Sequence, residues 1–127
     1  MVKAIQRSLL LVVLLFSSQA FSQHSVARMW NDVLLDAIRN DYARPTIHAR
    51  NLFHTSVLMY DTWAAYEDGA QTYFLGKDLN GFNVGFVGVP EPLDKKAYQE
   101  EALSYACYRL IQHRFQNSPG VSSTMAD

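Results

Sequence analysis

Between Pro45 and Tyr66, apolar residues recur at the spacing of an α-helix and cover one wide face of it. Phe, Tyr and Trp are prominent on this face, and a fully buried side chain of this size contributes roughly 1.5–3 kcal/mol to folding. That contribution is lost unless a large surface packs against the face. The segment therefore predicts a protein of several packed helices. The expected face comprises Ala49, Leu52, Phe53, Ser56, Val57, Met59, Tyr60, Trp63 and Ala64.

A second helix is predicted from Ser25 to Asn40, with Ser25 as the N-cap that accepts a hydrogen bond from an otherwise unpaired amide. Pro45 disfavours a helical conformation at Arg44 but suits a first helical turn, so it separates this helix from the next. Asp32, Asp36 and Arg39 lie off the apolar stripe and are expected to face water. The stripe comprises Val26, Met29, Trp30, Val33, Leu34, Ala37 and Ile38.

A third helix is predicted from Lys95 to Phe115, with Asp94 as its N-cap and Leu93 in the position of a hydrophobic staple. Because its apolar surface wraps broadly, we expect this helix to be buried on more than one side. Cys107 is expected to be a small core residue. One side carries Tyr98, Ala102, Tyr105, Ala106, Arg109 and His113, and another carries Leu103, Cys107, Leu110, Ile111 and Arg114.

The segment from Glu67 to Pro92 breaks the helical pattern with five glycines and two prolines. The apolar pieces Tyr73–Leu75 and Phe86–Val87 could pair as a small hairpin, but the density of glycine favours a long loop. A loop of this length in a compact domain is usually functional or spans other structure. The predicted fold class is thus all-α, a helical-bundle segment of about three helices with a long glycine-rich loop.

The first 22 residues have the three zones of a secretory signal peptide. Lys3 and Arg7 precede an apolar run from Leu9 to Phe16, and small residues follow it. The run is far shorter than the ~20 residues of a membrane span. We expect cleavage between Ser22 and Gln23, with cleavage after Ala20 as the alternative. The remaining region, 23–127, is expected to be exported to the periplasm or the extracellular space and to have no stable membrane span.

The charge of the exported region limits the partners expected for it, and its cysteine content limits the disulfides. Without Lys3 and Arg7 it holds 9 of the 11 basic residues against all 12 acidic residues. Such a balance gives no reason to expect nucleic acid or an anionic membrane as partner. Cys107 is the only cysteine, so no internal disulfide is possible.

Arg50, His54 and Asp61 are spaced to share one side of the helix from Pro45 to Tyr66. They could form an acid/base or anion-binding trio. They could instead form a hydrogen-bonded network that fixes the helix to its neighbours, and we favour this interpretation because no nucleophile or second acid joins them by spacing. His48 and His54 lie on different helix faces, and the chain lacks a Cys pair, an HExxH motif and a phosphate-binding glycine loop. No catalytic, cofactor-binding or metal-binding residue is therefore assigned.

Three stretches of the chain together resemble the N-terminal region of bacterial vanadium-dependent haloperoxidase-like proteins. They are WNDVLLDAIRNDYARPTIHARNLFH at 30–54, MYDTWAAY at 59–66 and EEALSYACYRLI at 100–111. That group is related to the type 2 phosphatidic acid phosphatases. The resemblance implies an α-helical bundle that holds vanadate, or phosphate in the phosphatases. It also implies peroxide-driven oxidation of halide by the full-length protein.

The anion-binding motifs of that family read K-x6-R-P, P-S-G-H and S-R-x5-H-x3-D. Arg44-Pro45 offers the R-P, but Ala37 stands where the Lys belongs. Residues 118–121 read Ser-Pro-Gly-Val, without the order or the His of the second motif, and the third motif is absent. No catalytic residue can be carried over from the family.

We therefore expect 23–127 to be an incomplete domain, the N-terminal scaffold part of an exported haloperoxidase-like protein that is inactive alone. Its partner would be the remainder of the helical bundle or a second copy of the chain. Two alternatives remain open: a non-catalytic exported helical binding module, and a fragment of an acid phosphatase-type relative.

Overall fold

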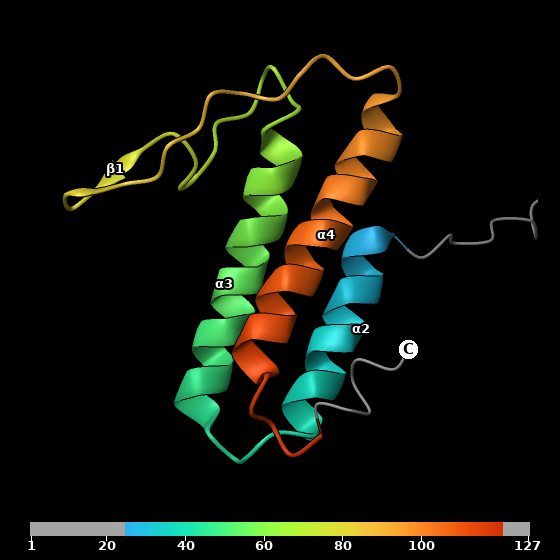
Figure 1. The fold of residues 1–127 in the computed structure, drawn as a ribbon, viewed down its shortest axis with the longest axis vertical. Coiled ribbons are helices and arrows are strands. Elements are labelled where there is room, and N and C mark those ends of the chain that lie inside the picture. The colour runs from blue at the N-terminus through green and yellow to red at the C-terminus, as the bar shows by residue number, and fades with distance from the viewer. Residues whose placement is uncertain (1–24, 121–127) are drawn as a thin grey trace, which may run out of the picture.

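The computed structural model describes residues 25–120, and the predicted signal peptide at 1–22 lies outside them. Within this range the fold is mostly helical, as predicted. It consists of α2 (Val26–Arg39), α3 (Pro45–Ala64) and α4 (Lys95–Phe115), with the two-residue strands β1 (Asp78–Leu79) and β2 (Phe82–Asn83). Helix α3 runs antiparallel to α2 and α4, and α4 packs against both of the other helices (Figure 1).

The helices begin where the sequence predicts. Ser25 caps α2 by accepting a hydrogen bond from the backbone N–H of Arg28 at 3.2 Å, and Asp94 caps α4 through the N–H of Ala97 at 3.1 Å. Pro45 occupies the first turn of α3, where its missing N–H costs nothing. Helix α3 ends at Ala64, two residues before the predicted end at Tyr66.

The apolar core of the described residues lies between α2 and α4. Leu34 and Ala37 of α2 pack with Ile111 and Phe115 of α4, and all four are buried. Trp30, Val33 and Ile38 complete the cluster from α2. Cys107 is also buried, and burial raises the pKa of its thiol to about 12. The thiol is therefore protonated and packs as a small apolar group, as predicted.

Helix α3 buries only part of the predicted face. Met59 and Ala64 of that face are buried, and the polar residues Asn51, Thr55 and Asp61 are buried beside them. Leu52, Phe53, Tyr60 and Trp63, which were expected to be buried, are between 40% and 50% exposed. The helical period was correct, but the described residues hold no surface that covers the aromatic side.

Helix α4 contacts both α2 and α3, in line with the expectation that more than one side of it is covered, although its fully buried residues form a single stripe. Its buried side is formed by Cys107, Ile111 and Phe115, whereas Tyr98 and Tyr105 on the other side are 42% and 63% exposed. Leu93 does not act as a hydrophobic staple, because it is 99% exposed and packs on nothing.

The connection between α3 and α4 covers residues 65–94 and projects away from the helices (Figure 1). Its tip is a hairpin in which Asp78 pairs with Asn83 and Leu79 with Phe82. Asn80 and Gly81 form the turn with φ of 54° and 84°, the left-handed conformation that a two-residue type I′ turn requires. The strands thus flank Asn80-Gly81 and do not use Tyr73–Leu75 and Phe86–Val87, the pieces considered above as a possible hairpin.

Residues 116–120 return to the end of α2. The Ser118 hydroxyl donates to the backbone carbonyl of Asn40 at 3.1 Å, and the Gly120 N–H donates to the same carbonyl at 3.2 Å. Ser118 is buried there. These bonds satisfy a carbonyl at the end of a helix, which otherwise lacks an intrahelical partner.

Gly120→Ala should destabilise the fold, because a Cβ at this position would overlap the side chain of Asn40. We expect a loss of about 1–3 kcal/mol, the usual cost of an overpacked contact, in the free energy of unfolding measured with urea. Gly85→Ala is the matched control, since nothing lies within 4 Å of a Cβ there. Equal stability of the two variants would contradict the tight contact between residue 120 and Asn40.

Candidate functional site

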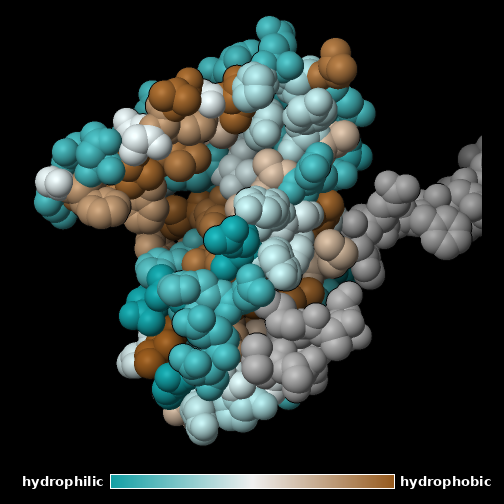
Figure 2. Space-filling view, in the orientation of Figure 1, coloured by the Kyte–Doolittle hydropathy of each residue, from teal (hydrophilic) through white to brown (hydrophobic). Residues whose placement is uncertain are grey.

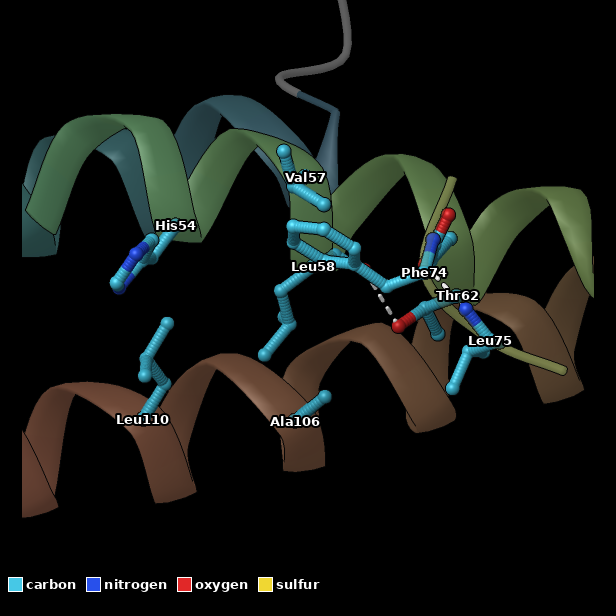
Figure 3. Close-up of a pocket in the computed structure, with 9 residues that line it drawn as sticks. His54, Val57, Leu58, Thr62, Phe74, Leu75, Ala106 and Leu110 are labelled. Atoms are coloured by element: carbon cyan, nitrogen blue, oxygen red, sulfur yellow. Dashed lines mark hydrogen bonds between the residues drawn. The ribbon is translucent and has the colours of Figure 1, made fainter. Parts of the chain in front are cut away.

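A groove between α3 and α4, closed at one end by the start of the connecting loop, is the candidate site. Its volume is about 420 Å³. Apolar surface gathers along the loop and in the hollow beneath it (Figure 2), and Figure 3 shows the lining side chains between the two helices. The walls are Val57, Leu58, Phe74, Leu75, Ala106 and Leu110, joined by the polar residues His54, Asp61 and Thr62.

The carboxylate of Asp61 holds the loop against the end of α3. It accepts hydrogen bonds from three consecutive backbone N–H groups, those of Tyr73, Phe74 and Leu75. The bonds from Phe74 and Leu75 measure 2.8 and 3.0 Å. Asp61 is only 4% exposed, so its charge is stabilised by these amides in place of water. The amides in turn place Phe74 and Leu75 over the groove.

A second set of polar contacts joins the end of α3 to the start of α4. Lys95 forms an ion pair with Glu67 at 2.7 Å, and the Gln99 amide donates to Glu67 at 2.9 Å and to the Trp63 carbonyl at 3.2 Å. The hydrogen bond from Lys95, followed by that from Gln99, holds the pKa of Glu67 below its ordinary value. The two ends of the long connection are thereby kept together.

His54 meets Arg114 across the groove. The Arg114 Nη2 lies 2.9 Å from the His54 Nδ1. Since a guanidinium can only donate, Nδ1 is the acceptor, and a neutral ring then carries its proton on Nε2. Burial lowers the pKa of His54, and the positive charges of Arg114 and Arg50 lower it further. The imidazole is therefore neutral at pH 7.

The structure does not bring Arg50, His54 and Asp61 together as a catalytic trio. His54 and Asp61 both line the groove, but each is bound to a different segment: His54 to α4 and Asp61 to the loop. Arg50 is exposed and approaches His54 only through its charge. These contacts are those expected of a network that fixes α3 to its neighbours.

Sequence reasoning missed the partners in this network. Arg114 was placed among the apolar side of α4, and no local pattern could show that it meets His54, 60 residues away in the chain. The groups that donate to Asp61 are backbone amides, which every sequence contains. The one local signal in this region is the pair Asn80-Gly81, which favours a tight turn. It marks the tip of the hairpin, beyond the amides that bind Asp61.

Residues 25–120 do not fit the anion site of the family that the sequence resembles. The Arg44 guanidinium of the Arg44-Pro45 pair is occupied by both oxygens of Asp41, at 2.7 and 2.9 Å. Burial tends to raise the pKa of Asp41, but Arg44 and the Tyr42 amide outweigh it and the pKa lies below its ordinary value. The Ser118 hydroxyl is bound to Asn40. Vanadate is therefore assigned to no residue of the described chain.

The part of the chain from 25 to 120 contains no group of three or more His, Cys, Asp or Glu residues that could hold a metal ion. In the same range, no helix combines the length and apolar character needed to cross a membrane. Comparison with protein-family models, curated proteins and solved structures finds no match to the chain.

Asp61→Asn should release the loop from α3. The amide that replaces one carboxylate oxygen faces N–H donors and leaves at least one of them buried without a partner. We expect a loss of at least roughly 2 kcal/mol in the free energy of unfolding. We also expect faster hydrogen exchange at the amides of residues 73–75. Asp68→Asn, at an exposed position on the same connection, should change neither. Unchanged exchange at 73–75 would contradict the role of Asp61.

His54 should make the stability of the protein depend on pH. Its pKa is lower in the folded state than the ordinary 6.5, so the unfolded state binds the proton more readily. The stability is therefore complete above pH 6.5 and falls as the pH drops through this value towards the folded pKa. His54→Asn keeps an acceptor near Nδ1 but does not titrate, and should flatten the decline of urea midpoints between pH 7.5 and 5. His113→Asn, on the exposed side of α4, is the control. Identical slopes in the parent and His54→Asn would show that the imidazole is not responsible.

Proposed function

We propose that residues 23–127 form the N-terminal scaffold of an exported protein resembling the vanadium-dependent haloperoxidases. The scaffold packs around a catalytic helical bundle, which is a separate part of the protein or of its assembly. Vanadate bound in that bundle would activate peroxide for the oxidation of halide. The scaffold itself supplies packing surface and has no activity alone.

The observation that carries this proposal is the exposed aromatic side of α3. Phe53, Tyr60 and Trp63 are 45–50% exposed, although residues of this kind usually provide the largest share of burial in a core. Contiguous exposed apolar surface on a soluble protein typically marks an interaction site. These three residues also lie within the stretches 30–54 and 59–66, which carry the family resemblance.

The distribution of polar contacts supports the same role. Asp61, His54 and Glu67 all bind other segments of the described chain, and none is presented to a substrate with a nucleophile beside it. Such contacts hold a surface in a defined shape. A surface of defined shape is the requirement for docking onto a second body.

A non-catalytic exported binding module is the second candidate. It is favoured by the closed cluster of Leu34, Ala37, Ile111 and Phe115, which gives the described residues a core of their own. Such a module would use the aromatic side of α3 on an external partner. A fragment of an acid phosphatase-type relative remains a variant of the scaffold proposal, with phosphate in the place of vanadate in the catalytic bundle.

The scaffold proposal predicts that the purified exported chain has no halogenating activity. Incubated with vanadate, peroxide and bromide, it should brominate an indicator substrate no faster than a blank, while an authentic vanadium haloperoxidase assayed in parallel gives turnover. Clear turnover would overturn the proposal. Thermal and urea unfolding separate the second candidate: a soluble monomer that unfolds cooperatively indicates a binding module, and aggregation or loosely packed behaviour indicates a scaffold without its partner.

A further inference from the structure

The groove between α3 and α4 continues along α4 beyond the candidate site. A second hollow of about 750 Å³ adjoins the first, and the two share Leu58, Ala106 and Leu110 as their floor. The second hollow runs along α4 from Tyr105 to Gln116, the residue that follows its last turn. At 1.5 Å per residue this part of α4 is roughly 16 Å long, or three helical turns. The combined surface, here called the α3–α4 channel, is open to the outside and has an apolar floor, with polar side chains of α4 along the second hollow.

The channel is separate from the contact between α2 and α4. Ile111 and Phe115 of α4 pack on α2, whereas Ala106 and Leu110 form the floor of the channel on another side of the same helix. No residue of α2 lines either hollow. Two helices with an open apolar channel between them present the geometry into which a further helix packs.

The charged groups around the channel are nearly all positive. Arg109 lines it, and Arg114 and Arg50 flank His54 at its side. Within residues 25–120 none of the three arginines forms an ion pair. Asp61 is the one carboxylate in the lining, and backbone amides occupy its oxygens. This excess of positive charge stands out in a chain whose formal net charge is −1.

Arg114 has N–H donors beyond the one that His54 accepts from. His54 takes one of its five N–H groups, and the buried Nε has no hydrogen-bond partner among the described residues. A buried donor without a partner is costly, and a carboxylate is the acceptor that suits a guanidinium best. The neutral His54 ring does not compensate the charge of either Arg114 or Arg50.

We infer that the α3–α4 channel is the docking site for an amphipathic helix of the partner bundle, whose apolar stripe carries a carboxylate that pairs with Arg114 and Arg50. The apolar floor receives the stripe, and the cationic rim sets the position of the acidic residue along it. This inference rests on the proposed scaffold function, which requires a partner surface, and it names that surface.

The test uses the full exported chain and three synthetic 18-residue helical probe peptides with a leucine stripe. The peptides differ in one residue at the centre of the stripe, which is Glu, Gln or Lys. Fluorescence anisotropy gives the affinities, and NMR shifts of Ala106 and Leu110 locate the binding. We expect the Glu peptide to bind at these residues about tenfold more tightly than the Gln peptide, with the Lys peptide weakest.

Arg114→Met and Arg50→Met should each reduce the preference for Glu over Gln, because methionine keeps apolar volume without the charge. Arg50 is exposed, so its replacement should leave the fold intact even if Arg114→Met does not. Arg28→Met, at an exposed site on α2, is the matched control and should keep the full preference.

Equal affinity for the three peptides, absence of binding, or shifts confined to Phe53 and Trp63 would each overturn the inference. So would binding of dodecanoate in the channel in place of the peptide, which would identify a site for small amphiphiles. The halogenation assay is independent of these measurements. Turnover by the chain alone would remove the scaffold function while leaving a measured preference for the Glu peptide in place.

Discussion

Ile111 and Phe115 of α4 pack against Leu34 and Ala37 of α2, and the rest of the described structure depends on this contact. It buries Leu34 and Ile111 almost completely and fixes the rotation of α4 about its axis. That rotation sends Cys107 into the interior and turns Tyr105, Arg109 and His113 outward. It also places Arg114 beside α3, and brings the end of α4 to Asn40, where residues 116–120 close onto α2.

Helix α3 is attached in a different way. Its inner face combines the apolar residues Met59 and Ala64 with the polar residues Asn51, Thr55 and Asp61, so hydrogen bonds join apolar burial in fixing its position. Hydrogen bonds and an ion pair hold α3 at both ends of its contact with the other segments. Near one end, Arg114 binds His54. Near the other end, Asp61 binds the loop amides and Lys95 pairs with Glu67. A helix held by hydrogen bonds keeps a defined register while its apolar side stays outside. The aromatic side of α3 and the open α3–α4 channel both follow from this arrangement.

Two surfaces of residues 25–120 are therefore left uncovered by the described chain, one aromatic and one with an apolar floor and a positive rim. Neither has the paired acid, base and nucleophile that chemistry on a substrate requires. The charged groups that do occur inside are used to hold segments of the chain in place. This division is the basis of the proposed scaffold role, together with the absence of the family's anion-binding motifs from a sequence that otherwise resembles its N-terminal region.

The sequence by itself determined the elements. Helical periodicity, Ser25 and Asp94 as caps, and Pro45 at a first turn all act within a few residues, so the three helices and the buried state of Cys107 were predictable. The hairpin at Asn80-Gly81 was also encoded locally, although it was not anticipated. Only the tertiary structure decided which face of α3 is buried, that Asp61 binds loop amides, and that His54 meets Arg114. Periodicity shows that an apolar face exists, but which face is covered depends on segments distant in the chain. Every residue except proline has a backbone amide, so a sequence does not show which amides bind a given side chain.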